Sequence, residues 1–259
     1  MKKGIDVSKH QGVVNFDQVK ASGAAEFIMI RAVSTNKKQG IYIDPQFERN
    51  YAECKRLGIP VGVYYYTYAQ TPAQVDAELA MLRKAIAGKQ FEYPVVVDVE
   101  ENLLKPLSAE ALTDLVIRAA KTIESWGCYA MVYTYTYYQQ TELNMSRLAA
   151  FDLWIADYRG TRPSIKHGMW QHTSRGRVPG VSGYVDCNFA YNDYPALIKG
   201  AKLNGFAEEV QAPAQPAAPA PHFIISTSPC TGGDAASLFA LLSEQAARLG
   251  NISVSKTEV

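Results

Sequence analysis

The sequence of 259 residues is poor in cysteine, histidine and net charge, and it contains no long apolar run. Its four cysteines, Cys54, Cys128, Cys187 and Cys230, lie far apart and form no CxxC pair. This spacing argues against a structural zinc site or a disulfide framework, so we expect free thiols in a reducing compartment. No group of His, Cys and Asp has metal-site spacing either, and we expect neither a metal nor a cofactor.

Net charge is almost absent, because 26 Lys and Arg oppose 25 Asp and Glu, which leaves a formal charge of +1. Without a basic block, we expect no nucleic-acid partner. No apolar run approaches the roughly 20 residues that a membrane-spanning helix needs, so we expect no membrane partner. The opening residues MKKGIDVSKHQG have two lysines but no apolar h-region, which predicts synthesis without a signal peptide.

What the sequence does contain is a regular alternation of strand-like and helix-like segments. Apolar runs rich in β-branched residues predict eight buried strands. In chain order they cover residues 4–8, 27–33, 60–68, 93–100, 129–136, 152–158, 168–173 and 185–191.

Three amphipathic helices with recognisable ends separate the early strands. Each opens on a capping residue and closes on a glycine. The predicted helices run from Asp44 to Gly58, from Thr71 to Gly88 and from Ser108 to Gly127. Five strand–helix steps followed by three strands without long helices predict an α/β fold, a parallel TIM-like barrel that loses its outer helices late. An open doubly wound sheet is the alternative.

A composition change divides the chain after this pattern. Residues 211–221, QAPAQPAAPAP, read as a semi-rigid linker. Beyond it, residues 222–259 predict a βαβ-like unit: strands in HFIISTS and NISVSKTEV around a helix that starts near Asp234. These 38 residues are too few to bury a convincing core alone. We therefore predict a barrel domain over 1–210 and a small module that self-associates, docks on the barrel or is completed by another copy.

The segment YPVVVDVEEN places two acids, Asp98 and Glu100, at the end of a buried run. Alternate residues of a strand face the same way, about 6–7 Å apart. Two such carboxylates repel, and the less solvated one holds its proton more tightly, which gives the protonated acid beside an ionised partner that glycosidic cleavage requires. The alternative is that these acids have no catalytic role and only contact solvent or an arginine at the end of the strand.

Two further acids stand at corresponding places. Asp6 lies near the end of the first predicted strand, and Asp186 occupies the equivalent place on the last, which neighbours the first once a barrel closes. In such barrels the catalytic groups sit at the C-terminal ends of the strands. We therefore expect four acids to line one cleft.

With these motifs, the sequence resembles the lysozymes of glycoside hydrolase family 25, the N-acetylmuramidase group often found as phage endolysins. The matching segments span residues 4 to about 195 and follow the family order: GIDVSKHQG, GVYYYTYA, VVVDVEEN, WIADY, MWQHTSRGRVPGVSG and VDCNF. The resemblance implies a (β/α)5β3 barrel, peptidoglycan as the substrate, and cleavage of the β-1,4 bond between N-acetylmuramic acid and N-acetylglucosamine.

The resemblance also implies residue roles. Glu100 resembles the general acid, Asp98 the partner that orients or stabilises the N-acetyl group of the substrate, and Asp6 a further catalytic acid. Other positions match residues that line the cleft and bind substrate, although for His10 a structural hydrogen bond is the alternative. These positions are Asp186, Tyr64, Tyr66, Tyr133, Trp154, Gln171 and His10.

Other readings stay open at this point. The barrel could be a catalytically silent carbohydrate-binding module, or a chitinase-like glycosidase, although EYPVVVDVE lacks the earlier acids of the chitinase pattern DxxDxDxE. For residues 222–259 the resemblance implies either cell-wall binding or homo-oligomerisation. It further implies an enzyme made in the cytoplasm of a host bacterium that reaches the wall after holin-type release.

Overall fold

The computed structural model describes residues 1–36, 39–206 and 233–249. The chain divides into two compact units, Met1–Glu208 and Glu209–Val259. Each unit is described by itself.

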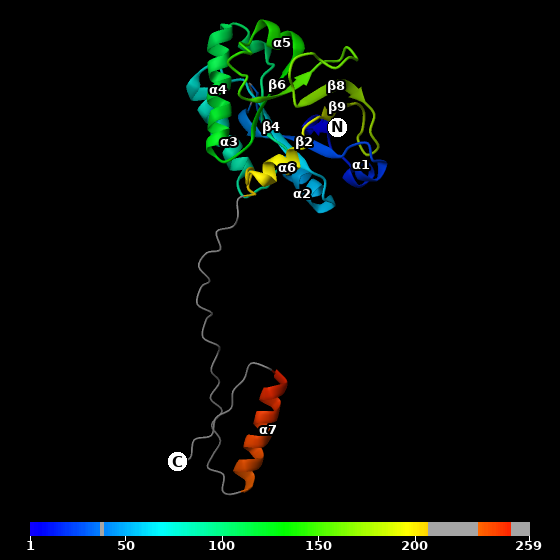
Figure 1. Cartoon of the computed structure of the whole chain (residues 1–259), viewed down its shortest axis with the longest axis vertical. Coiled ribbons are helices and arrows are strands. Elements are labelled where there is room, and N and C mark those ends of the chain that lie inside the picture. Colours follow the sequence, from blue (N-terminus) through cyan, green and yellow to red (C-terminus); the bar gives the residue numbers. More distant parts are fainter. Residues whose placement is uncertain (37–38, 207–232, 250–259) are drawn as a thin grey trace. The chain divides into compact units, whose positions relative to one another are not determined.

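The first unit is a closed barrel of eight strands (Figure 1). The ring runs β1-β9-β8-β7-β6-β5-β4-β2, and a pairing between β1 and β2 closes it. This closure confirms the barrel and excludes the open doubly wound sheet. The strands of the ring are β1 (Lys2–Val7), β2 (Phe27–Asn36), β4 (Val61–Tyr66), β5 (Val95–Asp98), β6 (Ala130–Tyr135), β7 (Asp152–Ala156), β8 (Met169–Gly176) and β9 (Val185–Ala190).

The barrel is not wholly parallel, which corrects one expectation. Strand β9 runs antiparallel to both β8 and β1. No crossover helix separates β8 from β9, and a short connection of that kind joins antiparallel neighbours. Asp186 therefore lies near the N-terminal end of its strand rather than at the C-terminal end, and it still reaches the end of the barrel where the other strands finish.

A ninth strand, β3 (Gly40–Ile43), was missed in the sequence. It pairs antiparallel with the last residues of β2, from Val33 to Asn36, and has no place in the ring. Its residues are exposed or only half-buried, so the apolar run that identifies a barrel strand is too short here.

The helices follow the capping signals in two of three cases. Helices α3 and α4 begin after Thr71 and Ser108, whose hydroxyls accept the N–H groups of Gln74 and Ala111. The predicted start at Asp44 was wrong: α2 begins three residues later. The helices are α1 (Phe16–Ser22), α2 (Phe47–Leu57), α3 (Pro72–Ile86), α4 (Ala109–Ser125), α5 (Thr136–Thr141) and α6 (Tyr194–Gly200), with 3₁₀ turns at Lys9–Gln11 and Asn102–Leu104.

Asp44 has partners on both carboxylate oxygens: Oδ1 accepts the backbone N–H of Gln46 at 2.9 Å, and Oδ2 is held by a buried arginine. Arg31 of β2 donates from Nε to Asp44 Oδ2 at 2.9 Å, and its Nη2 lies 2.8 Å from the same oxygen. The backbone N–H of Lys9 also donates to that oxygen, at 3.0 Å. A buried ion must be paired, so Asp44 serves as the partner of Arg31, and the N-cap position of α2 falls to Gln46, whose side chain makes no capping hydrogen bond.

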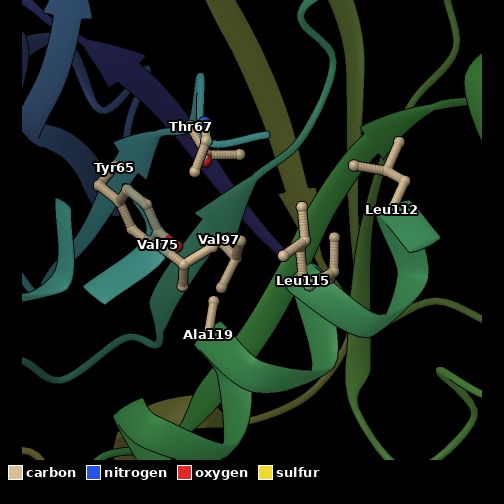
Figure 2. A pocket seen from close by; sticks show the side chains of 9 residues that line it. Tyr65, Thr67, Val75, Val97, Leu112, Leu115 and Ala119 are labelled. Atoms are coloured by element: carbon tan, nitrogen blue, oxygen red, sulfur yellow. The ribbon is translucent and has the colours of Figure 1, made fainter. Parts of the chain in front are cut away.

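The outer core lies between the strands and the helices. Val97 of β5 and Tyr65 of β4 face the apolar side of α4, which presents Leu115 and Ala119 (Figure 2). The cavity in this layer has a volume of about 10 Å³. That is about the minimum for one water molecule, so it is not a candidate ligand site.

The interior of the barrel is filled differently, by aromatic and methionine side chains. Phe27 and Tyr93 stack with ring centroids 4.2 Å apart, and Met29, Met131 and Met169 are fully buried beside them. Helix α6 packs its buried side chains against this cluster. The barrel is therefore solid at its centre, and a ligand can enter only at an end.

The cap of α4 gives a first test. Changing Ser108 to Ala removes the hydroxyl that accepts the Ala111 N–H at 3.2 Å. We expect the free energy of unfolding to fall by about 1 kcal/mol, whereas Ser108→Thr should lose much less. Urea denaturation of both variants measures this, and equal stability of Ser108→Ala and the unchanged protein would contradict it.

Of the second unit, the structure describes helix α7 (Gly233–Leu249), within one residue of the predicted position. The two strands predicted around it lie outside the described residues. Within those residues, no helix has the length and apolar character needed to cross a membrane. Cys54, Cys128 and Cys187 are free thiols, which confirms that expectation for three of the four cysteines.

Candidate active site

A cleft of about 310 Å³ opens at the end of the barrel where β1, β4, β5, β6 and β7 finish. All ten residues singled out in the sequence line it: Asp6, His10, Tyr64, Tyr66, Asp98, Glu100, Tyr133, Trp154, Gln171 and Asp186. The structure thus brings together residues from seven strands and from the turns that follow them.

The four acids approach the cleft from three strands. Asp98 is the last residue of β5 and is 4% exposed, and Glu100 follows two residues later. Asp6 of β1 is 6% exposed and stands directly opposite Asp186 of β9 in the antiparallel register. Glu100 and Asp186 are half-buried. Acids so close to one another, two of them buried, cannot all ionise at neutral pH.

Glu100 has a pKa close to neutrality. Burial raises its pKa to about 7, and the charge of Asp186 adds to the shift. The nearby Tyr133 hydroxyl acts in the opposite direction. A carboxyl with this pKa can both give and take a proton at the pH of most cells.

The other acids are shifted in the same direction. Burial, followed by the charge of Glu100, raises the pKa of Asp98 well above its usual range. Oδ1 of Asp98 is buried and has no hydrogen-bond partner among the described residues. Burial and then Asp186 raise the pKa of Asp6 to about 8. Burial also raises the pKa of Asp186. Because these groups interact, their protons come off in steps that belong to the cluster as a whole.

Two amide side chains hold Asp6. Gln171 Nε2 donates to Asp6 Oδ2 at 2.9 Å, and Asn188 Nδ2 donates to the same oxygen at 2.8 Å. The Tyr133 hydroxyl donates to Gln171 Oε1 at 2.9 Å and the Tyr158 hydroxyl at 2.6 Å. Gln171 therefore contributes to the cleft mainly through Asp6.

The predicted aromatic residues form the floor and one wall. Trp154 lies edge-on to Tyr64 and to Tyr133, with ring centroids 6.1 and 4.7 Å away. All three rings are buried, so they make an apolar floor that is also part of the barrel core. Tyr66 is half-buried, and its hydroxyl donates to Glu101 Oε2 at 3.1 Å. An apolar floor of aromatic rings beside carboxylates suits a sugar ring.

His10 borders the cleft from the 3₁₀ turn Lys9–Gln11. This turn is fixed by a reciprocal cap, in which Ser8 Oγ accepts the His10 N–H and Gln11 Oε1 accepts the Ser8 N–H. Burial and the nearby Arg31 lower the pKa of the imidazole. A neutral ring at pH 7 can bind a ligand by hydrogen bonding and is not a candidate for the acid.

Four lining residues were missed in the sequence: Arg31, Tyr158, Ser8 and Gln11. Arg31 could have been found from the sequence, because it is a charged residue within the apolar run FIMIRAV, as Asp98 is within YPVVVDVE. Asn188, which reaches Asp6 from below the cleft, also had a signal: it lies two residues after Asp186 on the same strand and so faces the same side. Tyr158 directly follows a strand, where its direction depends on the turn.

The arrangement can perform acid catalysis on a bond laid across it. It offers one carboxyl that is protonated up to about neutral pH and others within electrostatic reach of it. In the part of the chain that the structure describes, no group of three or more His, Cys, Asp or Glu side chains could hold a metal ion.

Comparison with known proteins supports this picture. The family model described as "Glycosyl hydrolases family 25" matches residues 5–181. The protein YegX of Escherichia coli K12 is 31% identical over 218 residues, which cover 81% of this chain and 72% of that protein. The "Autolytic lysozyme" of Clostridium acetobutylicum is 32% identical over 187 residues, 71% of this chain and 54% of the relative.

Solved structures agree. The CTP1L endolysin has a TM-score of 0.65 at 26% identity and covers 77% of this chain and 70% of its own. A bacterial lysozyme from Streptomyces coelicolor has a TM-score of 0.64, also at 26% identity, and covers 80% of this chain and 98% of its own. The match extends over the barrel, which carries the cleft.

Proposed function

The chain belongs to glycosyl hydrolase family 25 and is a glycoside hydrolase of the lysozyme type, and from this premise we propose that it cleaves the β-1,4 bond between N-acetylmuramic acid and N-acetylglucosamine in bacterial peptidoglycan. The observation that carries the proposal is the pair Asp98 and Glu100, one buried and one half-buried acid, both with raised pKa values, on the border of one open cleft. Relatives named endolysin and autolytic lysozyme support the choice of substrate.

Glu100 is the general acid in this proposal. Below about pH 7 its carboxyl carries the proton that the leaving glycosidic oxygen needs. Proton transfer from a positioned acid lowers the barrier most when the pKa of the acid lies near the working pH. The apolar floor formed by Tyr64, Tyr133 and Trp154 excludes water beneath the sugar and strengthens this transfer.

Asp98 is the partner that stabilises the developing positive charge or orients the N-acetyl group of the substrate. Its buried Oδ1, free of any donor among the described residues, is available to a group on the sugar. Its charge is coupled to that of Glu100, so a proton on one favours ionisation of the other. The carboxylates of glycosidases work as such pairs.

The second unit and the site of action complete the proposal. An enzyme with this substrate acts on the cell wall, and residues 222–259 would increase its residence there, either by binding the wall or by linking copies through avidity. A phage-type enzyme would be made in the cytoplasm of the host bacterium and reach the wall through a holin-type lesion. Fusion of residues 222–259 to a reporter, followed by sedimentation with purified walls, separates wall binding from oligomerisation.

The proposed bond is tested by product analysis. Purified peptidoglycan is incubated with the full chain, reduced with borohydride and analysed by mass spectrometry. We expect new reducing ends on N-acetylmuramic acid and loss of turbidity in parallel. Reducing ends on N-acetylglucosamine, or hydrolysis of chitin at a similar rate, would indicate a different glycosidase activity. If no new reducing ends formed, the barrel would be a catalytically silent carbohydrate-binding module.

A further inference from the structure

Asn188 is a buried polar residue that has no role in the proposed acid catalysis by Glu100 and Asp98. It lies on β9, is 1% exposed and is held between two partners. Trp154 Nε1 donates to its Oδ1 at 2.9 Å, and its Nδ2 donates to Asp6 Oδ2 at 2.8 Å. An indole N–H can only donate, so the oxygen of the amide must face Trp154 and its NH₂ group must face Asp6.

This fixed orientation decides where Asp6 can carry a proton. Oδ2 of Asp6 already accepts two N–H groups, from Asn188 and from Gln171. A proton on Oδ2 would point at two donors and would find no acceptor, so a proton on Asp6 belongs on Oδ1. The structure records no hydrogen bond to Oδ1 from the residues it describes, and Asp6 lines the cleft.

The surroundings of Asp6 favour the neutral form. Negative or ionisable groups face it from β9, β4 and β6 and from the residues after β5 and β7, and Arg31 of β2, a cation that lines the same cleft, is already paired with Asp44. Burial, followed by the charge of Asp186, raises the pKa of Asp6 to about 8. The ionisable groups are Asp186 of β9, Asp98 and Glu100 after β5, Tyr64 of β4, Tyr133 of β6, and Tyr158.

We propose that Asp6 acts in the resting enzyme as a neutral hydrogen-bond donor, with its proton on Oδ1 directed to an oxygen of the bound sugar, and that Asn188, locked by Trp154, is the positioning residue that fixes this arrangement. The inference rests on the proposed function for the identity of the sugar. It assigns Asp6 a role distinct from that of a base or nucleophile, since a neutral carboxyl can be neither.

A titration tests the proposal without substrate. The side-chain carboxyl of Asp6 is followed by ¹³C NMR in the full chain between pH 4 and 9 and is assigned by its absence from Asp6→Asn. We expect the signal of a protonated carboxyl at pH 6.5. Asn188→Leu removes one donor to the ionised form and should raise the midpoint by about one pKa unit.

The control is Asn192→Leu. Asn192 is exposed, lies beyond the other end of β9 and donates to Asp152 Oδ2 at 3.0 Å, so it makes a similar amide–carboxylate contact far along the strand. This change should leave the Asp6 titration where it was. A midpoint near 4 for Asp6 in the unchanged protein would overturn the proposal, and an unmoved midpoint in Asn188→Leu would overturn the role of Asn188.

Kinetics of two Asp6 variants give a second, independent answer. Asn at this position can accept both amide N–H groups at one atom and donate from its NH₂ group at the place of Oδ1, whereas Ala can do neither. We expect a loss of about 10²–10³-fold in kcat for Asp6→Ala, the usual effect of removing one preorganised donor, and a loss at least ten-fold smaller for Asp6→Asn.

Equal losses in the two Asp6 variants would identify Asp6 as a group that must ionise and would overturn the proposal. If Asn188→Leu does not fold, the proposal for Asp6 is still tested by the titration of the unchanged protein and by the comparison of Asp6→Ala with Asp6→Asn. The titration uses no substrate. If the protein failed to hydrolyse peptidoglycan, the proposed function would be wrong, but the titration would still show whether Asp6 is neutral.

Discussion

Glu100→Gln is expected to lose peptidoglycan hydrolysis by about 10²–10⁴-fold while keeping its fold, since Gln has the shape of the acid but cannot supply the proton. The loss should appear in kcat, because the proton is transferred only in the transition state. The thermal unfolding midpoint should not fall, because the change removes a half-buried acid that is repelled by Asp186. Turbidity loss and circular dichroism measure the two effects.

The same carboxyl determines how activity depends on pH. Since burial raises the pKa of Glu100 to about 7, the proton is present below that pH and is lost above it. The activity of the unchanged enzyme should therefore fall as the pH rises through about 7, and the small residual activity of Glu100→Gln should lack this decline.

A surface glutamate provides the control for this result. Glu110 lies on α4 and pairs with Arg147 at 2.7 Å, and its side chain is 61% exposed. Glu110→Gln makes the same chemical change outside the cleft and should keep full activity. Hydrolysis by Glu100→Gln at the rate of Glu110→Gln would show that another residue is the acid.

Asp98→Asn should combine a large loss of activity with a gain in stability. We expect activity to fall by about 10²-fold or more, because the negative charge that stabilises the transition state is removed. Stability should rise at pH 8, because the buried Asp98 is repelled by Glu100 and Asp6 and has one oxygen without a partner. A gain of about 1 kcal/mol would raise the unfolding midpoint by roughly 2–4 °C.

The gain must depend on pH in a definite direction. Folding raises the pKa of Asp98, so the folded protein binds this proton more tightly than the unfolded chain does. Its contribution is favourable at low pH and is lost as the pH rises through the folded-state pKa. Asn does not titrate, so the advantage of Asp98→Asn should be larger at pH 8 than at pH 4.

Asp114→Asn is the matched control for that change. Asp114 is on α4, and its side chain is 63% exposed and paired with Arg147. Its variant should change neither the activity nor the pH dependence of unfolding. A lower midpoint for Asp98→Asn at pH 8, or the same gain at both pH values, would show that Asp98 is not a destabilising acid in the folded enzyme.

Much of the fold could be predicted because its signals are local. The eight ring strands are apolar runs, and the caps Thr71 and Ser108 act within three residues of themselves. The start of α2 could not be predicted in the same way, because one oxygen of Asp44 is engaged by Arg31, thirteen residues away, and the other accepts the Gln46 N–H ahead of the helix. The direction of β9 was also hidden, since a strand pattern reads the same in both directions.

The candidate site divides in a similar manner. Acids that interrupt buried runs, such as Asp98, could be found from their neighbours in the chain. Asn188 and Gln171 were harder to interpret, because they meet Asp6 across 182 and 165 residues and their amide groups are oriented by Trp154, Tyr133 and Tyr158. Such contacts exist only after the barrel closes.

By itself, the sequence determined the barrel strands, the main helices and the resemblance to one hydrolase family, because these depend on residues that are close along the chain or on a fixed order of motifs. Only the tertiary structure decided which acids share a cleft, which of them keep a proton near neutral pH and where Asp186 stands on its strand. The physical reason is that a pKa depends on burial and on neighbouring charges, and both are set by residues that folding brings together from distant strands.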